Sequence, residues 1–132
     1  MSRLEERIEN FNKAFKVFKE AHDEYLNDPS RIVFRLAEIQ GFEVLFELSW
    51  KVLKDYIEIK GYKESAPRDV IKKAFLLNYL PNAQTWIDML KDRNCTSREY
   101  DQKKADEVFE RITTVYYDEL YRFYNWVKTE AK

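Results

Sequence analysis

Residues that interrupt helices are scarce in this chain: its 132 residues include only 2 Gly and 3 Pro. Between them, apolar side chains recur at intervals of three and four, and β-branched residues never gather into an alternating run. The sequence therefore predicts an all-α protein. Its length is close to the commonest size of one domain, so residues 1–132 are expected to form a single helical bundle domain.

The spacing predicts three long helices. The first ends before Pro29, the second runs from Arg31 to about Lys60 and is apolar on several sides, and the last runs from about Asp101 to Lys128. Helices of about 25 to 30 residues each span roughly 40 Å, which favours an elongated, up-and-down antiparallel bundle. The first helix carries one apolar stripe, formed by Leu4, Ile8, Phe11, Phe15, Phe18, His22 and Tyr25.

Two short helices are predicted between the second and the last long helix. Gly61 is expected to end the second helix, and Ser65 to cap the next one, with Pro67 in the first turn, where its missing N–H is harmless. The other short helix is expected to begin near Pro81 and to end around Arg93. About five helices result.

Charge, cysteine content and hydropathy limit which ligands, disulfides and membrane segments the chain can have. The chain has 23 Lys and Arg against 24 Asp and Glu, so no general attraction to nucleic acid or to an anionic membrane is expected, and any RNA site must be local. Cys95 is the only cysteine, which excludes an internal disulfide. The charged start, MSRLEERIEN, and the lack of a long apolar run predict a cytoplasmic protein without a membrane segment.

Signatures of metal and cofactor chemistry are missing. The sequence has no Gly-rich phosphate loop, no cysteine cluster and a single histidine, so neither a metal nor a cofactor is expected. His22 lies on the apolar stripe and is interpreted as a histidine at the edge of the core, bonded to a neighbour. Cys95 is interpreted as an ordinary reduced cysteine, since no base is placed beside it. Most aromatic residues have helical spacing and are assigned to the core or an interface.

The stretch MLKDRNCTSREYDQKKA, residues 89–105, breaks the helical pattern with a group of hydrogen-bond donors. We expect the end of one helix and the start of the next to bring these donors into one corner that binds phosphate or carboxylate, with local positive charge from neighbouring lysines. Alternatively, the arginines pair with Asp92, Glu99 or Asp101 and only cap a helix junction. The corner comprises Arg93, Asn94, Thr96, Ser97, Arg98 and Tyr100, and the lysines are Lys91, Lys103 and Lys104.

Three blocks resemble the nucleotidyltransferase substrate-binding proteins, a compact branch of the HEPN superfamily: FEVLFELSWKVLKDYIE at 42–58, SAPRDVIKKAF at 65–75 and WIDMLKDRNCTSREYD at 86–101. The resemblance implies an up-and-down helical bundle that dimerises. It also implies a two-protein module of toxin–antitoxin type, in which such a protein binds a minimal nucleotidyltransferase encoded beside it. In that module the HEPN protein is a ribonuclease, and the transferase silences it by adenylylation.

The family's ribonuclease motif is Arg, four residues, His, one residue, Tyr, and it falls here on Arg93, Arg98 and Tyr100. Arg98 therefore stands in place of the histidine, while Asn94, Thr96 and Ser97 keep the family's pattern. Tyr100 resembles the tyrosine that is adenylylated. An arginine, with a pKa above about 12, stays protonated and cannot shuttle the proton that metal-independent RNA cleavage requires.

Three functions follow as hypotheses. The first is a partner subunit of a minimal nucleotidyltransferase, as a homodimer or in a heterotetramer with the transferase, whose degenerate motif still faces RNA or a nucleotide. The second is an active, metal-independent endoribonuclease toxin in which Arg93 and Arg98 are catalytic and adenylylation at Tyr100 neutralises it. The third is a structural dimerisation scaffold without a ligand. Arg98 disfavours the enzyme, and the surviving Arg93, Asn94 and Tyr100 disfavour the pure scaffold.

Overall fold

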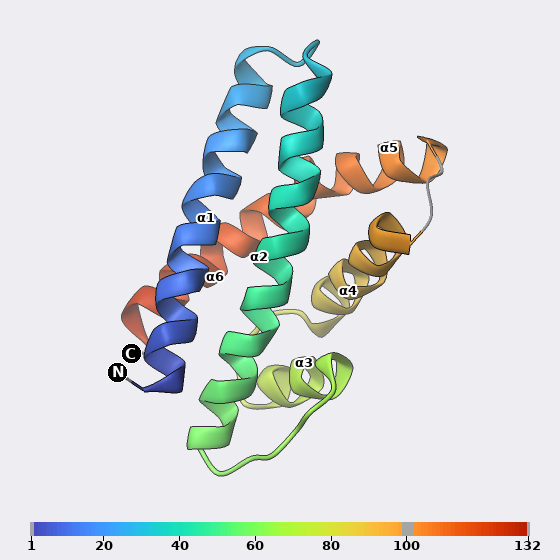
Figure 1. Cartoon of the computed structure of the whole chain (residues 1–132). Helices are drawn as coiled ribbons and strands as arrows, with labels where there is room; N and C mark the ends of the chain where they lie inside the picture. The colour runs from blue at the N-terminus through green and yellow to red at the C-terminus, as the bar shows by residue number, and fades with distance from the viewer. Residues whose placement is uncertain (1, 99–101, 132) are drawn as a thin grey trace.

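The two longest helices form an antiparallel hairpin. The computed structural model describes residues 2–98 and 102–131. Helix α1 (Arg3–Asn27) begins after Ser2, whose Oγ accepts a hydrogen bond of 3.1 Å from the Glu5 N–H, and α2 (Ile32–Ile59) returns alongside it. The two helices pack along most of their length (Figure 1). The predicted extents of both helices are confirmed.

Gly61 ends the second helix as predicted. Its φ of 99° lies in the left-handed region that glycine tolerates, and the Tyr62 N–H donates back to the Ile57 carbonyl at 2.9 Å. The next helix, α3 (Pro67–Leu76), carries Pro67 in its first turn. The capping role predicted for Ser65 is wrong, because Ala66 occupies the cap position and makes no side-chain hydrogen bond.

Helix α4 (Ala83–Arg98) is longer than predicted. The Asn82 side-chain oxygen caps its start, accepting from the N–H groups of Gln84 at 2.8 Å and Thr85 at 3.3 Å. The predicted end at Arg93 is wrong: no Gly or Pro follows, and the polar residues after Arg93 continue the helix to Arg98. The two motif arginines therefore belong to one helix, and not to two helices joined by a loop.

The C-terminal segment is helical from Gln102 to Thr129 but is not one uniform α-helix. Helix α5 (Gln102–Arg111) leads into a π-helical turn, η1 (Ile112–Tyr116), which leads into α6 (Tyr117–Thr129). In the turn, the Tyr117 N–H bonds to the Ile112 carbonyl, five residues back. Figure 1 shows this segment crossing behind α1 and α2, with α5 beyond α2 and close to the end of α4.

The core is rich in aromatic side chains. Trp86 of α4 packs edge-on against Phe123 of α6, with ring centroids 4.9 Å apart, and Phe11 of α1 contacts the same ring at 5.4 Å. His22 is buried, its Nδ1 lies 2.7 Å from the Glu38 Oε2, and its ring stacks on Tyr117. The interpretation of His22 as a bonded core-edge residue is confirmed. The described residues contain helices and no strand, so the all-α bundle is confirmed as well.

Candidate functional site

Arg93 of α4 is held by an acid from α2. Its Nη2 lies 3.0 Å from the Glu47 Oε2, and its Nη1 lies 3.4 Å from the side-chain oxygen of Asn94. The Arg93 side chain is 32% exposed, so it lies at the surface while its orientation is constrained. Because α2 and α4 contact one another, the ion pair with Glu47 holds the guanidinium against α2.

The Glu47 carboxylate contacts hydrogen-bond donors on three side chains. Besides Arg93, it accepts from the Trp50 indole N–H at 3.1 Å, and the Lys51 Nζ lies 3.2 Å from its Oε1. Partial burial favours a higher pKa for Glu47, but the hydrogen bonds from Trp50 and Lys51 and the charge of Arg93 outweigh it, so the pKa lies below its usual range. Glu47 is therefore a carboxylate at neutral pH.

Asp92, next to Arg93 on α4, faces a different helix. Arg111 of α5 donates to both Asp92 oxygens, from Nε at 2.7 Å and from Nη2 at 2.9 Å, and the Tyr116 hydroxyl donates at 2.5 Å. The hydrogen bonds to Asp92 raise the pKa of Arg111, and burial together with the Asp92 carboxylate raises that of Tyr116. This network fastens α4 to the C-terminal segment at the π-turn.

The pairing of Arg93 with Asp92, one of the predicted alternatives, is wrong. The Asp92 oxygens bind Arg111 and Tyr116, while Arg93 pairs with Glu47. Sequence reasoning missed both Glu47 and Arg111. The spacing of Glu47, Trp50 and Lys51 on one helical face offered a signal for a polar cluster, but nothing in the sequence links that cluster to α4.

Only part of the predicted corner can be compared with the structure. The Arg93 Nη1 lies 3.4 Å from the Asn94 side-chain oxygen, and Lys91, Lys103 and Lys104 are exposed. The last turn of α4 contains Thr96, Ser97 and Arg98, of which the structure describes the backbone and not the side chains. Glu99, Tyr100 and Asp101 lie outside the described residues altogether.

A hollow of about 520 Å³ separates α4 from α5, on the side of α4 that carries Asp92. Its volume is in the range of small-molecule sites. Cations and acids alternate around it, and the exposed Cys95 lies at its rim, so it has no uniform charge. It is lined by Asp88, Lys91, Asp92, Cys95, Lys104, Glu107, Val108 and Arg111.

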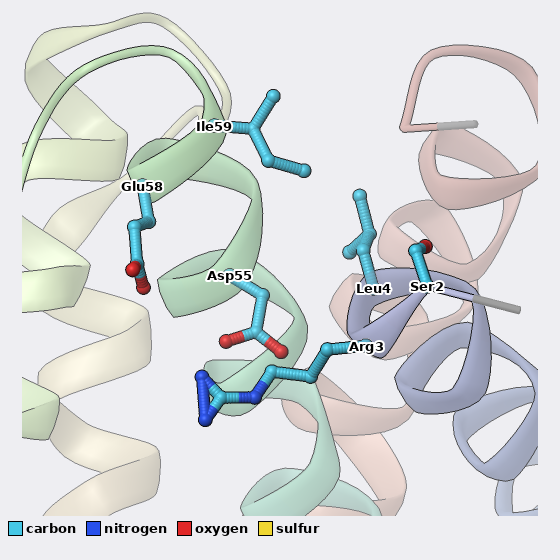
Figure 2. A pocket seen from close by; sticks show the side chains of 6 residues that line it. All are labelled: Ser2, Arg3, Leu4, Asp55, Glu58 and Ile59. Atoms are coloured by element: carbon cyan, nitrogen blue, oxygen red, sulfur yellow. The ribbon is translucent and has the colours of Figure 1, made fainter.

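A second hollow lies near the start of α1 and the end of α2, away from the motif. Figure 2 shows the Arg3 side chain extending beneath the carboxylate of Asp55, with Glu58 on the same helix. Arg7 donates to Asp55 at 3.0 Å. The described residues that line this hollow come from the start of α1 and the end of α2 and do not include Arg93, so it is distinct from the candidate site around Arg93.

The described residues contain neither a metal-binding cluster nor a membrane-spanning helix. No group of three or more His, Cys, Asp or Glu side chains there could hold a metal ion. No helix in the described part of the chain is both long enough and apolar enough to cross a membrane.

Comparisons with known proteins agree with the resemblance seen in the sequence. The model of the family described as nucleotidyltransferase substrate binding protein like matches residues 6–129. A Haemophilus influenzae protein named as a probable ribonuclease HepT is 32% identical over 79 residues, which are 56% of this chain and 54% of that protein. The chain thus spans about half the length of this relative.

A similar fold is found in a crystal structure of a protein from Thermus thermophilus. It is 31% identical, has a TM-score of 0.74, and the match covers 92% of this chain and 98% of that one. The likeness therefore extends over nearly the whole helical bundle. Together with the match to the family model over residues 6–129, it leads to one conclusion: the chain belongs to the nucleotidyltransferase substrate-binding-protein-like family.

Proposed function

We propose that this protein is the helical partner subunit of a minimal nucleotidyltransferase in a cytoplasmic module of toxin–antitoxin type. Its degenerate ribonuclease motif is retained as a surface that faces a phosphate or nucleotide. The observation that carries the proposal is the Arg93 guanidinium, held at the surface of α4 by Glu47 and close to Lys51. The family to which the chain belongs supports the transferase as the partner.

The chemistry of the motif favours binding over cleavage. A guanidinium can hold a phosphate through two parallel hydrogen bonds, and the ion pair with Glu47 orients that of Arg93. Cleavage also needs a group that gains and loses a proton near neutral pH, and the motif has Arg98 where that histidine would stand. The proposed site therefore keeps the part that binds phosphate and lacks the part that transfers a proton.

Tyr100 is proposed as the residue that the transferase modifies. The phenol oxygen would attack the α-phosphorus of ATP, forming a phosphodiester with adenylate and releasing pyrophosphate. The lysines and arginines around residues 91–104 would then lie near the added negative charge.

Labelling with ATP tests this proposal. The protein is incubated with the proposed partner, a minimal nucleotidyltransferase, and with ATP labelled at the α-phosphate. We expect one label on the wild type, none on Tyr100→Phe, and full labelling of Tyr62→Phe, a control at an exposed tyrosine far from the motif. Full labelling of Tyr100→Phe would contradict the assignment of the modified residue.

The assembly is proposed to be a homodimer, alone or within a heterotetramer with the transferase. One side of the first half of α2 exposes apolar side chains without a covering helix: Ile32, Val33, Leu36 and Val44 are each about half exposed or more. Exposed apolar patches of this kind commonly mark interfaces between proteins.

An active metal-independent endoribonuclease is the second candidate. It is supported by the Haemophilus influenzae relative, which is named as a probable ribonuclease. It requires Arg98 to act only through its charge, since it cannot exchange a proton at neutral pH. A pure dimerisation scaffold, the third hypothesis, requires that substitution of Arg93 leaves every binding property unchanged.

A further inference from the structure

Lys51 and Arg93 are bridged by one carboxylate. The Lys51 Nζ lies 3.2 Å from the Glu47 Oε1, and the Arg93 Nη2 lies 3.0 Å from the Glu47 Oε2. The three side chains are exposed to similar degrees, from 30% to 32%, so water and solutes reach them. The cation site around Arg93 therefore extends onto α2, which the ribonuclease motif does not include.

We propose that Lys51 and Arg93 form a single site for a phosphoryl group and that Glu47 acts as its internal competitor. Carboxylate and phosphate oxygens accept the same hydrogen bonds from ammonium and guanidinium groups. The Glu47 carboxylate therefore occupies the bridging position that a ligand phosphate would take. This inference deepens the proposed function, and its link to nucleotides rests on that function.

The charge balance shows how Glu47 would lower the affinity. With Glu47 ionised, the three side chains carry a net charge of +1, and without that acid the net charge would be +2. One unit charge at a distance of a few ångströms in a partly exposed site changes anion affinity by about three- to tenfold. The hydrogen bond from the Trp50 indole N–H favours this position of the Glu47 carboxylate.

Substitutions at Glu47 separate charge from shape. Glu47→Gln removes the charge but keeps an amide oxygen that can accept from Trp50, whereas Glu47→Asp keeps the charge. Lys51→Met removes the proposed second cation. Glu58→Gln, near the end of the same helix and exposed, is the matched control. Thermal unfolding of each variant establishes that it is folded.

The probes are inorganic pyrophosphate and a single-stranded RNA oligonucleotide. Pyrophosphate binding is followed in the NMR spectrum through the Trp50 indole N–H signal, which is assigned with Trp50→Phe, and RNA binding by fluorescence anisotropy. We expect Glu47→Gln to bind pyrophosphate about three- to tenfold more tightly than the wild type. Glu47→Asp and Glu58→Gln should bind like the wild type, and Lys51→Met more weakly.

The two probes distinguish the two proposals. Pyrophosphate affinity that is unchanged or reduced in Glu47→Gln overturns the role of Glu47 as a competitor, even if RNA binding depends on Arg93. Tighter pyrophosphate binding by Glu47→Gln, with no RNA binding by any variant, upholds the competitor and excludes RNA as the phosphate-bearing ligand of the proposed surface. No pyrophosphate binding by any variant overturns the site itself.

Discussion

Two buried acids of this bundle, Asp92 and Glu38, differ in how many of their carboxylate oxygens accept hydrogen bonds. Both Asp92 oxygens accept bonds from Arg111 and one also accepts from Tyr116. Glu38 bonds His22 through Oε2, but its buried Oε1 has no hydrogen-bond partner among the described residues. Burial raises the pKa of Glu38 above its ordinary value of 4.5, and hydrogen bonding and charge from His22 only partly oppose this. Ionised Glu38 therefore lowers the stability of the fold.

Glu38→Gln is expected to change how stability depends on pH. The folded state binds the Glu38 proton more tightly than the unfolded state does, so protonation of Glu38 stabilises the fold. This stabilisation is fully present below about pH 4.5 and is lost as the pH rises through the raised pKa. The glutamine variant has no carboxyl group to ionise at this position, so it does not lose this stabilisation as the pH rises. Its free energy of unfolding in urea, compared with that of the wild type from pH 4 to pH 7, should improve as the pH rises. Curves that stay parallel over this range would exclude Glu38 as the titrating group.

At the scale of the helices, the sequence predicted the two long helices of the hairpin and the end of the second helix at Gly61. Apolar spacing and a glycine that can adopt a left-handed conformation are both local signals. The sequence did not predict the π-turn, where the consecutive residues Tyr116 and Tyr117 are both buried, one bonded to Asp92 and the other stacked on His22. It likewise placed the end of α4 too early. Such features follow from packing between helices, and no residue type marks them in the sequence.

Gly41→Ala tests how closely α1 and α2 approach. A Cβ at Gly41 would lie 3.3 Å from the Phe18 Cδ1 and 3.4 Å from its Cα, and the Phe18 ring is fully buried against Tyr117. Alanine favours helices over glycine by up to about 1 kcal/mol, but the contact should outweigh this gain and lower the free energy of unfolding by about 1 kcal/mol. Urea denaturation measures this change.

Ala37→Gly, at an exposed position one turn earlier on α2, is the matched control for the glycine substitution. It should also lose about 1 kcal/mol, but through helix propensity alone. An increase in stability on Gly41→Ala would show that Phe18 can move away, and the tight approach of the two helices would then not limit the residue at this position.

At the scale of the whole molecule, the family and the bundle could be recognised from sequence blocks, and the motif gave Arg93 and Asn94. The partners of the site could not be predicted. Glu47 reaches α4 from α2, a helix far from it in the sequence, and Arg111 reaches Asp92 only because α5 packs back against α4. The exposed apolar side of α2 likewise becomes visible only once the other helices are in place.

Leu36→Glu tests the proposed homodimer. Leu36 is 58% exposed in the middle of the apolar stripe on α2, so the substitution should leave the fold intact but place charges in the interface. Sedimentation velocity should show a dimer for the wild type and a monomer for the variant. Leu76→Glu, at a 69% exposed leucine on α3, should remain dimeric. A wild type that is monomeric at all concentrations would contradict the dimer.

The central claim, that the motif binds phosphate but lacks a proton-transferring group, is tested most directly by the rate of RNA cleavage. Wild type, Arg98→His, Arg93→Ala and the double variant are compared on single-stranded RNA with chelator present. We predict that the wild type cleaves no faster than Arg93→Ala. Arg98→His should gain a rate of about 10²- to 10⁴-fold, the usual contribution of general acid–base catalysis, and the double variant should lose that gain. Cleavage by the wild type that disappears on substitution of either arginine would contradict the claim and establish the ribonuclease.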